Sequence, residues 1–292
     1  MAHDALRAGS AGVIVAGGME SMSNAPYLLA KHRGGARIGH DVVKDSMFLD
    51  GLEDAYEPGR LMGSFAEDSA RDYQFSRVAQ DEYALESLAR AQRAIAEGAF
   101  ADEIVGVETK AGLVAEDEQP GKARPDKIPG LKPAFAKDGT ITAANASSIS
   151  DGAAALVLAR SDVAAKLGLR VRARIVAHAA HAHEPAKFAT APVPAIRKVL
   201  DRAGWRVADV DLFEVNEAFA AVAMIAMQDL GIDRGRLNVH GGATALGHPI
   251  GASGARILAT LVAALERTGG RRGVAALCIG GGEATAMAVE LI

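Results

Sequence analysis

The sequence predicts an α/β fold with two related halves, because one order of elements occurs twice along the chain. Each copy has the end of a helix, a glycine, a short apolar strand, and then glycines followed by a glutamate. We expect the helices at 3–8 and 255–266, and the strands at 12–16 and 273–279. A further strand is expected later in each half, at 152–159 and 284–291. This repetition is typical of a duplicated α/β unit.

The two predicted halves are unequal. The second half has two more strands before its helix, at 171–177 and 210–215, and two more helices, at 194–202 and 217–230. The first half begins inside its helix, so we expect it to be incomplete. The predicted division is 1–22 with 146–165 for the remnant of the first half, 23–145 for an inserted α-rich loop domain, and 166–292 for the second half.

The insertion combines charged helices with irregular chain. Residues 64–74 and 77–97 are amphipathic and predicted to be helical. The charged helix at 77–97 is expected to be a solvated face. Residues 116–140 contain four prolines and several lysines, which favours a loop. Long connections without secondary structure usually have a function, such as covering a ligand.

Composition excludes several classes of protein. The net charge of −4 argues against a nucleic-acid surface. The single cysteine excludes an intramolecular disulfide and suits a reducing compartment. The N-terminal residues mix acids with bases, unlike a signal peptide, and the longest apolar runs are too short to span a membrane. We therefore expect a cytoplasmic protein that binds neither nucleic acid nor membrane.

Three side chains of the second half have the chemistry of thiol-based acyl transfer: Cys278, His248 and Asn216. Taken singly, they have ordinary explanations as a small buried hydrophobe, a hydrogen-bonded loop histidine and a helix N-cap. The glycines after Cys278, however, allow backbone N–H groups to approach a ligand and hold an oxyanion. All three are expected at strand-to-helix corners, where α/β sheets place their sites.

The sequence resembles the thiolases, the acetyl-CoA C-acyltransferases, over its whole length. The resemblance lies in Asn-Glu-Ala-Phe-Ala at 216–220, Gly-His-Pro-Ile-Gly-Ala-Ser-Gly at 247–254, Cys-Ile-Gly-Gly-Gly at 278–282, Ala-Gly-Gly-Met-Glu-Ser-Met-Ser at 16–23, Asn-Ala-Ser at 145–147, and Asp-Gly at 151–152. It implies a thiolase-like α/β fold of duplicated halves with mixed sheets. The implied reaction moves an acyl group between CoA thioesters, by condensation of acetyl-CoA or thiolysis of 3-ketoacyl-CoA. It also implies coenzyme A as a substrate, no separate cofactor, and a homodimer or homotetramer.

The resemblance implies a role for each candidate residue. His248 would activate a nucleophilic cysteine and help to bind the thioester oxygen, while Asn216 would position a water in the same oxyanion hole. Cys278 would take a proton from the α-carbon of acetyl-CoA in condensation and return it in thiolysis. The amide of Gly280 would contribute to a second oxyanion hole. Residues that would contact CoA or border the acyl pocket are Ser147, at the pantetheine arm, with Met62, Phe188, Ala218 and Phe219.

The sequence departs from the thiolase pattern at three places. Thiolases use two cysteines, and the nucleophile would fall just before Met1, so the chain resembles a thiolase that starts at an internal methionine. Leu61 stands where many members have histidine, and Phe188 where many short-chain members have methionine. The missing nucleophile predicts that this chain has impaired activity.

Three other interpretations are a non-catalytic binder, a ketoacyl synthase and a metal site. A non-catalytic relative that binds CoA or acyl groups stays open, because the nucleophile is absent. A ketoacyl synthase would have a second histidine where Asn216 and Cys278 stand. We expect no metal site: His178, His181 and His183 lie close in sequence to Glu184, but no cysteine is near and the segment fits the thiolase pattern.

Overall fold

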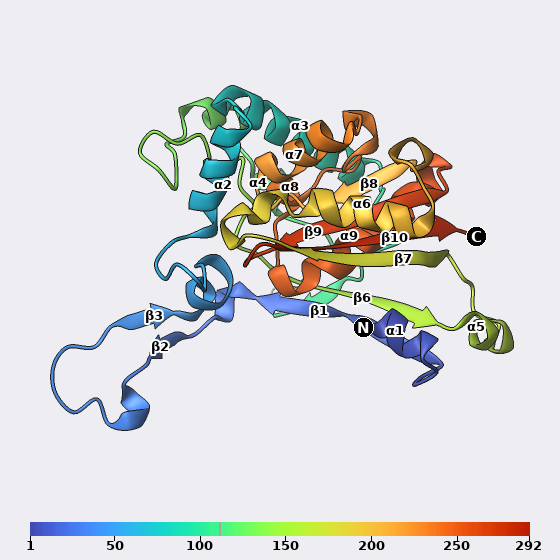
Figure 1. Ribbon diagram of the computed structural model, residues 1–292, viewed down its shortest axis with the longest axis horizontal. Helices are drawn as coiled ribbons and strands as arrows, with labels where there is room; N and C mark the ends of the chain where they lie inside the picture. Colours follow the sequence, from blue (N-terminus) through green and yellow to red (C-terminus); the bar gives the residue numbers. More distant parts are fainter. Residues whose placement is uncertain (111) are drawn as a thin grey trace.

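The computed structural model describes residues 1–110 and 112–292. Its main body is layered, with two helices on one face of a four-stranded sheet and a third helix between that sheet and a two-stranded one (Figure 1). No helix among the described residues is both long and apolar enough to cross a membrane.

The four-stranded sheet is mixed. Its strands, in spatial order, are β7 (Ala173–Ala182), β10 (Glu283–Leu291), β9 (Arg272–Ile279) and β8 (Leu212–Val215). Strand β10 runs antiparallel to both β7 and β9, whereas β8 runs parallel to β9. All four residues of β8 are buried, which explains why its sequence is almost continuously apolar. The strands predicted at 273–279 and 284–291 are thus confirmed.

Helices cover both faces of this sheet. On one face lie α6 (Pro192–Ala203) and α7 (Ala220–Leu230), which bury a large cluster that includes Phe213 and Val215. On the other face α9 (Ile250–Thr268) forms a second cluster with Leu212 and Val289. Alternate residues of β8 therefore join opposite cores, as strand geometry requires.

The two-stranded sheet pairs β1 (Val13–Ser21) antiparallel with β6 (Asp151–Ala159) beside α1 (Ala2–Arg7) and α5 (Ser161–Leu167). The expectation that Gly17 and Gly18 end the first strand is wrong, because β1 continues through both. A Cβ at Gly17 would lie 2.0 Å from the carbonyl oxygen of Ala154, and a Cβ at Gly18 would lie 2.1 Å from that of Gly251. These glycines let β6 and α9 approach β1 closely.

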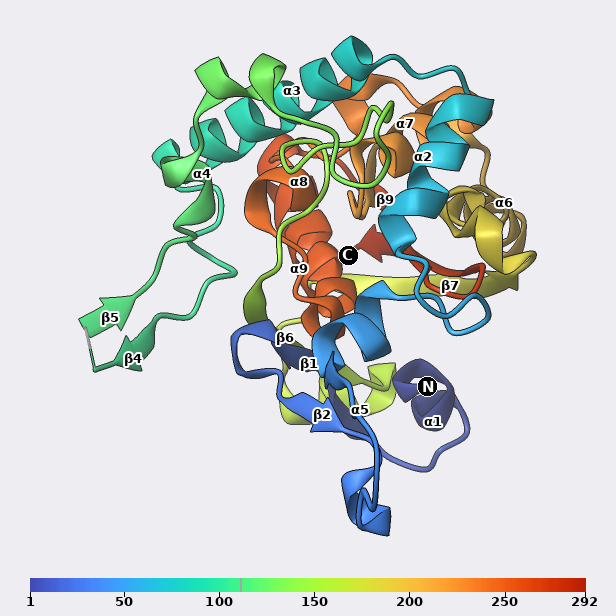
Figure 2. The ribbon, with the colours of Figure 1, turned by 90° about the vertical axis from the view of Figure 1, so that its left-hand side faces the viewer.

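The chain between the two strands of this sheet forms helices and two projecting hairpins. Figure 2 shows the hairpins, β2 (Tyr27–Leu29) with β3 (Val43–Asp45) and β4 (Val107–Thr109) with β5 (Gly112–Val114), extending away from the main body. The helices of this segment are α2 (Met62–Asp72), α3 (Arg77–Ala96) and α4 (Gln119–Lys122).

The prediction that 77–97 is a solvated face is wrong. Helix α3 buries polar side chains as well as apolar ones, among them Gln80, Asp81, Ser87 and Arg90. Each of these has hydrogen-bond partners on other segments, which offsets its loss of water. Composition alone could not reveal those partners.

Short helical turns complete the structure. They are α8 (Ala243–Leu246), the 3₁₀ turns Met22–Asn24, His32–Gly34, Pro125–Gly130, Pro185–Thr190, Val207–Asp209 and Arg234–Arg236, and one π turn, Phe48–Leu52.

Candidate active site

Asn216 contacts His248 directly. It follows the last residue of β8, and its backbone N–H donates to the carbonyl of Ala276 on β9 at 3.0 Å. Its side-chain Nδ2 lies 3.2 Å from Nε2 of His248. The expected helix start at Glu217 is wrong, since α7 begins at Ala220 and Asn216 is not its N-cap. The extra extended residues leave the Asn216 amide free to reach the histidine.

The hydrogen bonds around His248 fix its tautomer. The hydroxyl of Ser253 donates to the carbonyl of Pro249 at 2.9 Å, so its proton is already used. Nδ1 of His248, 2.6 Å from that hydroxyl oxygen, must therefore carry a proton and donate it. Nε2 is then the acceptor that faces Asn216. Burial, reinforced by the charge of Arg256, lowers the pKa of His248 to about 4, so the imidazole is neutral at pH 7.

Cys278 lies at the same end of the same sheet. It is the penultimate residue of β9, the strand that pairs with β8, and it is buried. Burial raises the pKa of the Cys278 thiol to about 12, so it is protonated at neutral pH. The residues after it, 280–282, form the tight turn into β10. The expectation of a strand-to-helix corner is therefore wrong for Cys278.

The surroundings of Cys278 are apolar. Cys278 shares one buried cluster with Phe188 and Phe219, whose rings lie 6.3 Å apart edge to face. A Cβ at Gly280 would lie 3.4 Å from Sδ of Met62, which places Met62 over the turn. Cys278 and four other candidate residues therefore gather on this side of the site.

Ser147 and Ala218 are joined by two hydrogen bonds. The backbone N–H and the hydroxyl of Ser147 both donate to the carbonyl oxygen of Ala218, each at 3.0 Å. Ala218 also packs against the cluster that contains Cys278. Ser147 is thereby joined through Ala218 to the cluster that contains Cys278, although these residues come from segments far apart in sequence.

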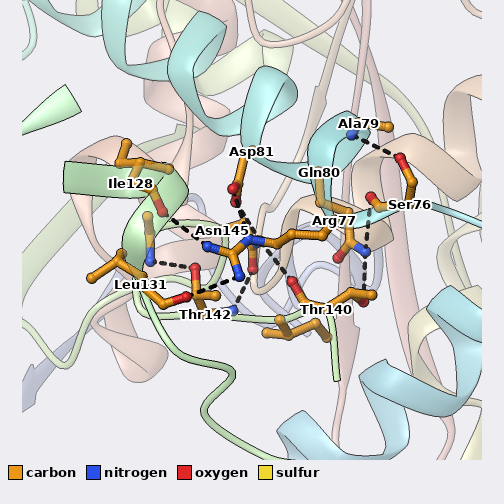
Figure 3. Close-up of polar contacts among 12 residues, drawn as sticks. Ser76, Arg77, Ala79, Gln80, Asp81, Ile128, Leu131, Thr140, Thr142 and Asn145 are labelled. Atoms are coloured by element: carbon orange, nitrogen blue, oxygen red, sulfur yellow. Dashed lines mark hydrogen bonds and ion pairs between the residues drawn. The ribbon is translucent and has the colours of Figure 1, made fainter. Parts of the chain in front are cut away.

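A polar network fixes the segment that precedes Ser147 (Figure 3). Asn145 donates to the carboxylate of Asp81 at 2.9 Å, and its Oδ1 accepts from the N–H of Thr142 at 2.8 Å. Arg77 bonds the same carboxylate at 2.6 Å and reaches the carbonyls of Ile128 and Leu131. This network links Ser147 to α3 and to the loop over it.

Glu217 is a residue that the sequence reasoning missed. Its carboxylate is fully buried and accepts five hydrogen bonds, at 2.6 to 3.2 Å, from Tyr83, Ser87, Asn238 and, twice, Thr244. These donors satisfy the carboxylate oxygens, and no ion pair to Glu217 is found among the described residues. A signal was present in the sequence, because a carboxylate inside an apolar stretch beside a candidate catalytic residue needs partners.

Glu217 holds both members of the Asn216–His248 pair. Thr244 lies in α8, four residues before His248. Asn238 bonds the N–H and the C=O of Val215, the residue before Asn216, at 2.9 Å each. The two chain segments that carry Asn216 and His248 are therefore fixed to one buried carboxylate.

Comparison with known families identifies the family of this chain. Residues 1–162 match the N-terminal domain of thiolase, and residues 169–291 match its C-terminal domain. The chain belongs to the thiolase family. The predicted family is thus confirmed, and so is a thiolase-like α/β fold with mixed sheets.

Individual thiolases are similar along nearly the whole chain. The acetyl-CoA acetyltransferase of Rhizobium meliloti is 50% identical over 287 residues, which are 97% of this chain and 72% of that protein. Acetyl-CoA acetyltransferase 2 of Arabidopsis thaliana is 48% identical over 100% of this chain and 74% of its own length. The solved acetyl-CoA acetyltransferase of Bacillus anthracis has a TM-score of 0.94 at 41% identity, covering 99% of this chain and 74% of that chain. Thiolase Acat5 from Ascaris suum, solved in complex with coenzyme A, also has a TM-score of 0.94, at 43% identity and the same two coverages.

Proposed function

We propose that this chain carries the proton-transfer side of thiolase acyl exchange between CoA thioesters. The observation that carries the proposal is the neutral His248, bonded to Asn216 at the end of the sheet where Cys278 lies as a protonated thiol. In thiolysis the Cys278 thiol gives its proton to the α-carbon of the departing acetyl-CoA and becomes a thiolate; in condensation that thiolate accepts the α-proton and becomes the thiol again.

Asn216 and His248 form an oxyanion hole in this proposal. Oδ1 of Asn216 is buried and accepts no hydrogen bond from the residues that the structure describes. A buried amide oxygen needs a donor, and a water molecule supplies one. This supports a role for Asn216 in positioning water, next to the Nε2 atom that would bind the thioester oxygen when protonated. The amide of Gly280 would stabilise a second oxyanion.

Coenzyme A would bind beside Ser147, under residues 23–145. The connection from Ser147 through Asn145 and Asp81 to the loop at 125–131 supports this position, because the loop and the pantetheine site share one network. The complex of the Ascaris suum thiolase with coenzyme A supports the ligand class. Met62, Phe188, Ala218 and Phe219 would border the acyl pocket.

The proposed domain division stays as the sequence predicts it. Residues 1–22 and 146–165 are the remnant of one thiolase half, 23–145 the insertion, and 166–292 the other half. Strands β1 and β6 pair antiparallel, as β9 and β10 do, which supports two related halves. A homodimer or homotetramer in the cytoplasm remains a prediction.

Turnover by this chain should be slow, because Cys278 is its only cysteine. One sulfur cannot hold the acyl group and accept the α-proton in the same step. The test is cleavage of acetoacetyl-CoA, with the Rhizobium meliloti relative as reference. We expect a rate at least ~10³-fold below the reference. Equal rates would show that the assignment of roles is wrong.

The single cysteine also favours a second function, non-catalytic binding of CoA or acyl groups. Deuterium exchange at the α-carbon of acetyl-CoA separates the two. The acyl-transfer proposal expects exchange that is lost in Cys278→Ala, whereas a pure binder shows none in either protein. If calorimetry detects no binding of CoA at millimolar concentration, both functions fail.

A further inference from the structure

We propose that His3, Asp4 and His178 form a binding site for a divalent transition metal ion, with zinc as the probe because it accepts these ligand types. His3 and Asp4 lie in the first turn of α1, whereas His178 lies in the middle of β7, an edge strand of the four-stranded sheet. The three side chains meet outside the candidate active site and have no part in the proposed acyl transfer.

Two imidazoles converge on one carboxylate oxygen. Nε2 of His178 lies 2.8 Å from Oδ1 of Asp4, and Nδ1 of His3 lies 3.3 Å from the same oxygen. One ligand atom from each residue lies within 4.8 Å of the other two. The centroids of the two imidazole rings are 5.1 Å apart and the rings are nearly perpendicular, while each ring has one nitrogen near the carboxylate.

These distances are close to those of a tetrahedral zinc site. With Zn–N and Zn–O bonds of about 2.0–2.1 Å, neighbouring ligand atoms lie roughly 3.3 Å apart. The separations of 2.8 and 3.3 Å lie near this value. Small side-chain rotations would bring the third separation into range. Two imidazoles and one carboxylate are a ligand set that zinc accepts, with water in the fourth position.

The site is accessible to an ion and its water. The side chains of His3 and His178 are 22% and 34% exposed, and that of Asp4 is 56% exposed. Partly exposed imidazoles beside a carboxylate can exchange solvent for a metal without opening a core. His178 is paired across the sheet with Met287, which packs toward α9, so its ring lies on the α9 face of β7.

The sequence grouped His178 with the wrong partners. The rings of His181 and His183 contact each other at 5.0 Å, and Nε2 of His183 bonds the carbonyl of Lys187. Among the residues that the structure describes, the group with metal-ligating geometry is His3, Asp4 and His178. The fold brings α1 to β7 across more than 170 positions, which spacing along the chain cannot indicate.

A metal at this site would connect α1 with the four-stranded sheet. A link between distant residues restricts the unfolded chain, and an ion that binds only the folded state stabilises it by mass action. Zinc should therefore raise the melting temperature of the protein.

Calorimetric titration of the untagged chain with zinc chloride tests the proposal. We expect one zinc per chain with a dissociation constant of about 10 µM or tighter. His178→Ala and His3→Ala should each weaken binding at least ~10-fold. His32→Ala is the matched control, because His32 pairs with Asp41 at 3.3 Å but this pair belongs to no group with metal-ligating geometry among the described residues. This variant should bind zinc like the wild type.

Two further readouts keep the outcome clear. Cobalt(II) should give the visible absorption of a tetrahedral site in the wild type and in His32→Ala, but not in His178→Ala. Zinc should raise the melting temperature of the first two proteins only, while circular dichroism verifies that every variant folds. No detectable binding at about 1 mM zinc, 100-fold above the expected dissociation constant, would overturn the proposal. Binding that His178→Ala leaves unchanged would overturn it as well.

Discussion

The two sides of the candidate site are built from different interactions. On one side, Asn216 and His248 are held by hydrogen bonds that lead to the buried carboxylate of Glu217. On the other side, Cys278 lies in an apolar cluster with Phe188 and Phe219. The stability of the polar side depends on the direction of each hydrogen bond, whereas that of the apolar side depends mainly on the volume of its side chains. Single-atom changes should therefore affect the first side far more than the second.

Both sides nevertheless keep their titratable group uncharged. Burial lowers the pKa of His248 to about 4 and raises that of Cys278 to about 12. The shifts are opposite because a base is neutral after losing its proton and an acid is neutral while it holds one. A neutral acceptor and a neutral donor at pH 7 suit transfer of a proton, and stability should fall at both ends of the pH range.

The largest effect should come from Glu217→Gln. The replacement turns one acceptor oxygen into an NH₂ group that faces donors, so at least one buried donor loses its partner. We expect the free energy of unfolding to fall by about 3 kcal/mol in urea denaturation. Glu86→Gln is the matched control: its carboxylate is 49% exposed and bonds Arg90, so we expect about 0–1 kcal/mol. Equal losses in the two variants would contradict the polar network.

The contribution of Cys278 should be seen in the free energy of unfolding at alkaline pH. Its folded pKa is raised above the ordinary value of 9.0, so its contribution is complete below pH 9 and is lost as pH rises toward 12. Between pH 9 and about 10.5 the free energy of unfolding should fall by about 2 kcal/mol more in the wild type than in Cys278→Ala. Identical slopes for the two proteins would mean that the thiol is not shielded from water.

The contribution of His248 should be seen in the free energy of unfolding at acid pH. Its folded pKa is depressed below the ordinary value of 6.5, so its contribution is present above pH 6.5 and is lost as pH falls toward 4. Because His248 is only partly buried, we expect a loss of about 1.5 kcal/mol between pH 6.5 and about 5. Chemical denaturation of wild type and His248→Gln over this range measures the difference, and a steeper slope in the variant would refute it.

The smallest effect should come from Cys278→Ala at pH 7. The substitution removes one sulfur from an apolar cluster and leaves no polar partner unpaired, so the expected loss is about 1 kcal/mol. Urea denaturation beside Glu217→Gln provides the direct comparison. If Cys278→Ala is as destabilising as Glu217→Gln, the two sides of the site do not differ in the way described.

The sequence predicted the strands and turns that carry the candidate residues better than the contacts between them. The strand that carries Cys278 and the glycine turn after it follow from local pattern, because an apolar run and a turn signal are short-range features. The start of α7 does not, since the bonds that Asn216 and Glu217 make to distant segments replace the first helical turn. Tertiary hydrogen bonds override local propensity at that point.

Other features depend on partners that the sequence cannot pair. Glu217 accepts from Tyr83 and Ser87, which precede it by 134 and 130 positions. Gly17 and Gly18 lie within a strand because β6 and α9 approach them, although glycine pairs ordinarily indicate a turn. In both cases the decisive contact is long-range, so only the folded structure shows it.

The central claim is that Cys278 moves a proton and does not carry the acyl group. Mass spectrometry of the intact protein and of its peptides after incubation with acetyl-CoA tests it most directly, with the Rhizobium meliloti acetyltransferase as the positive control. We predict no acetyl thioester on the peptide that contains Cys278. A stoichiometric acetyl group on Cys278, removable by hydroxylamine, would contradict the account and make this cysteine the nucleophile.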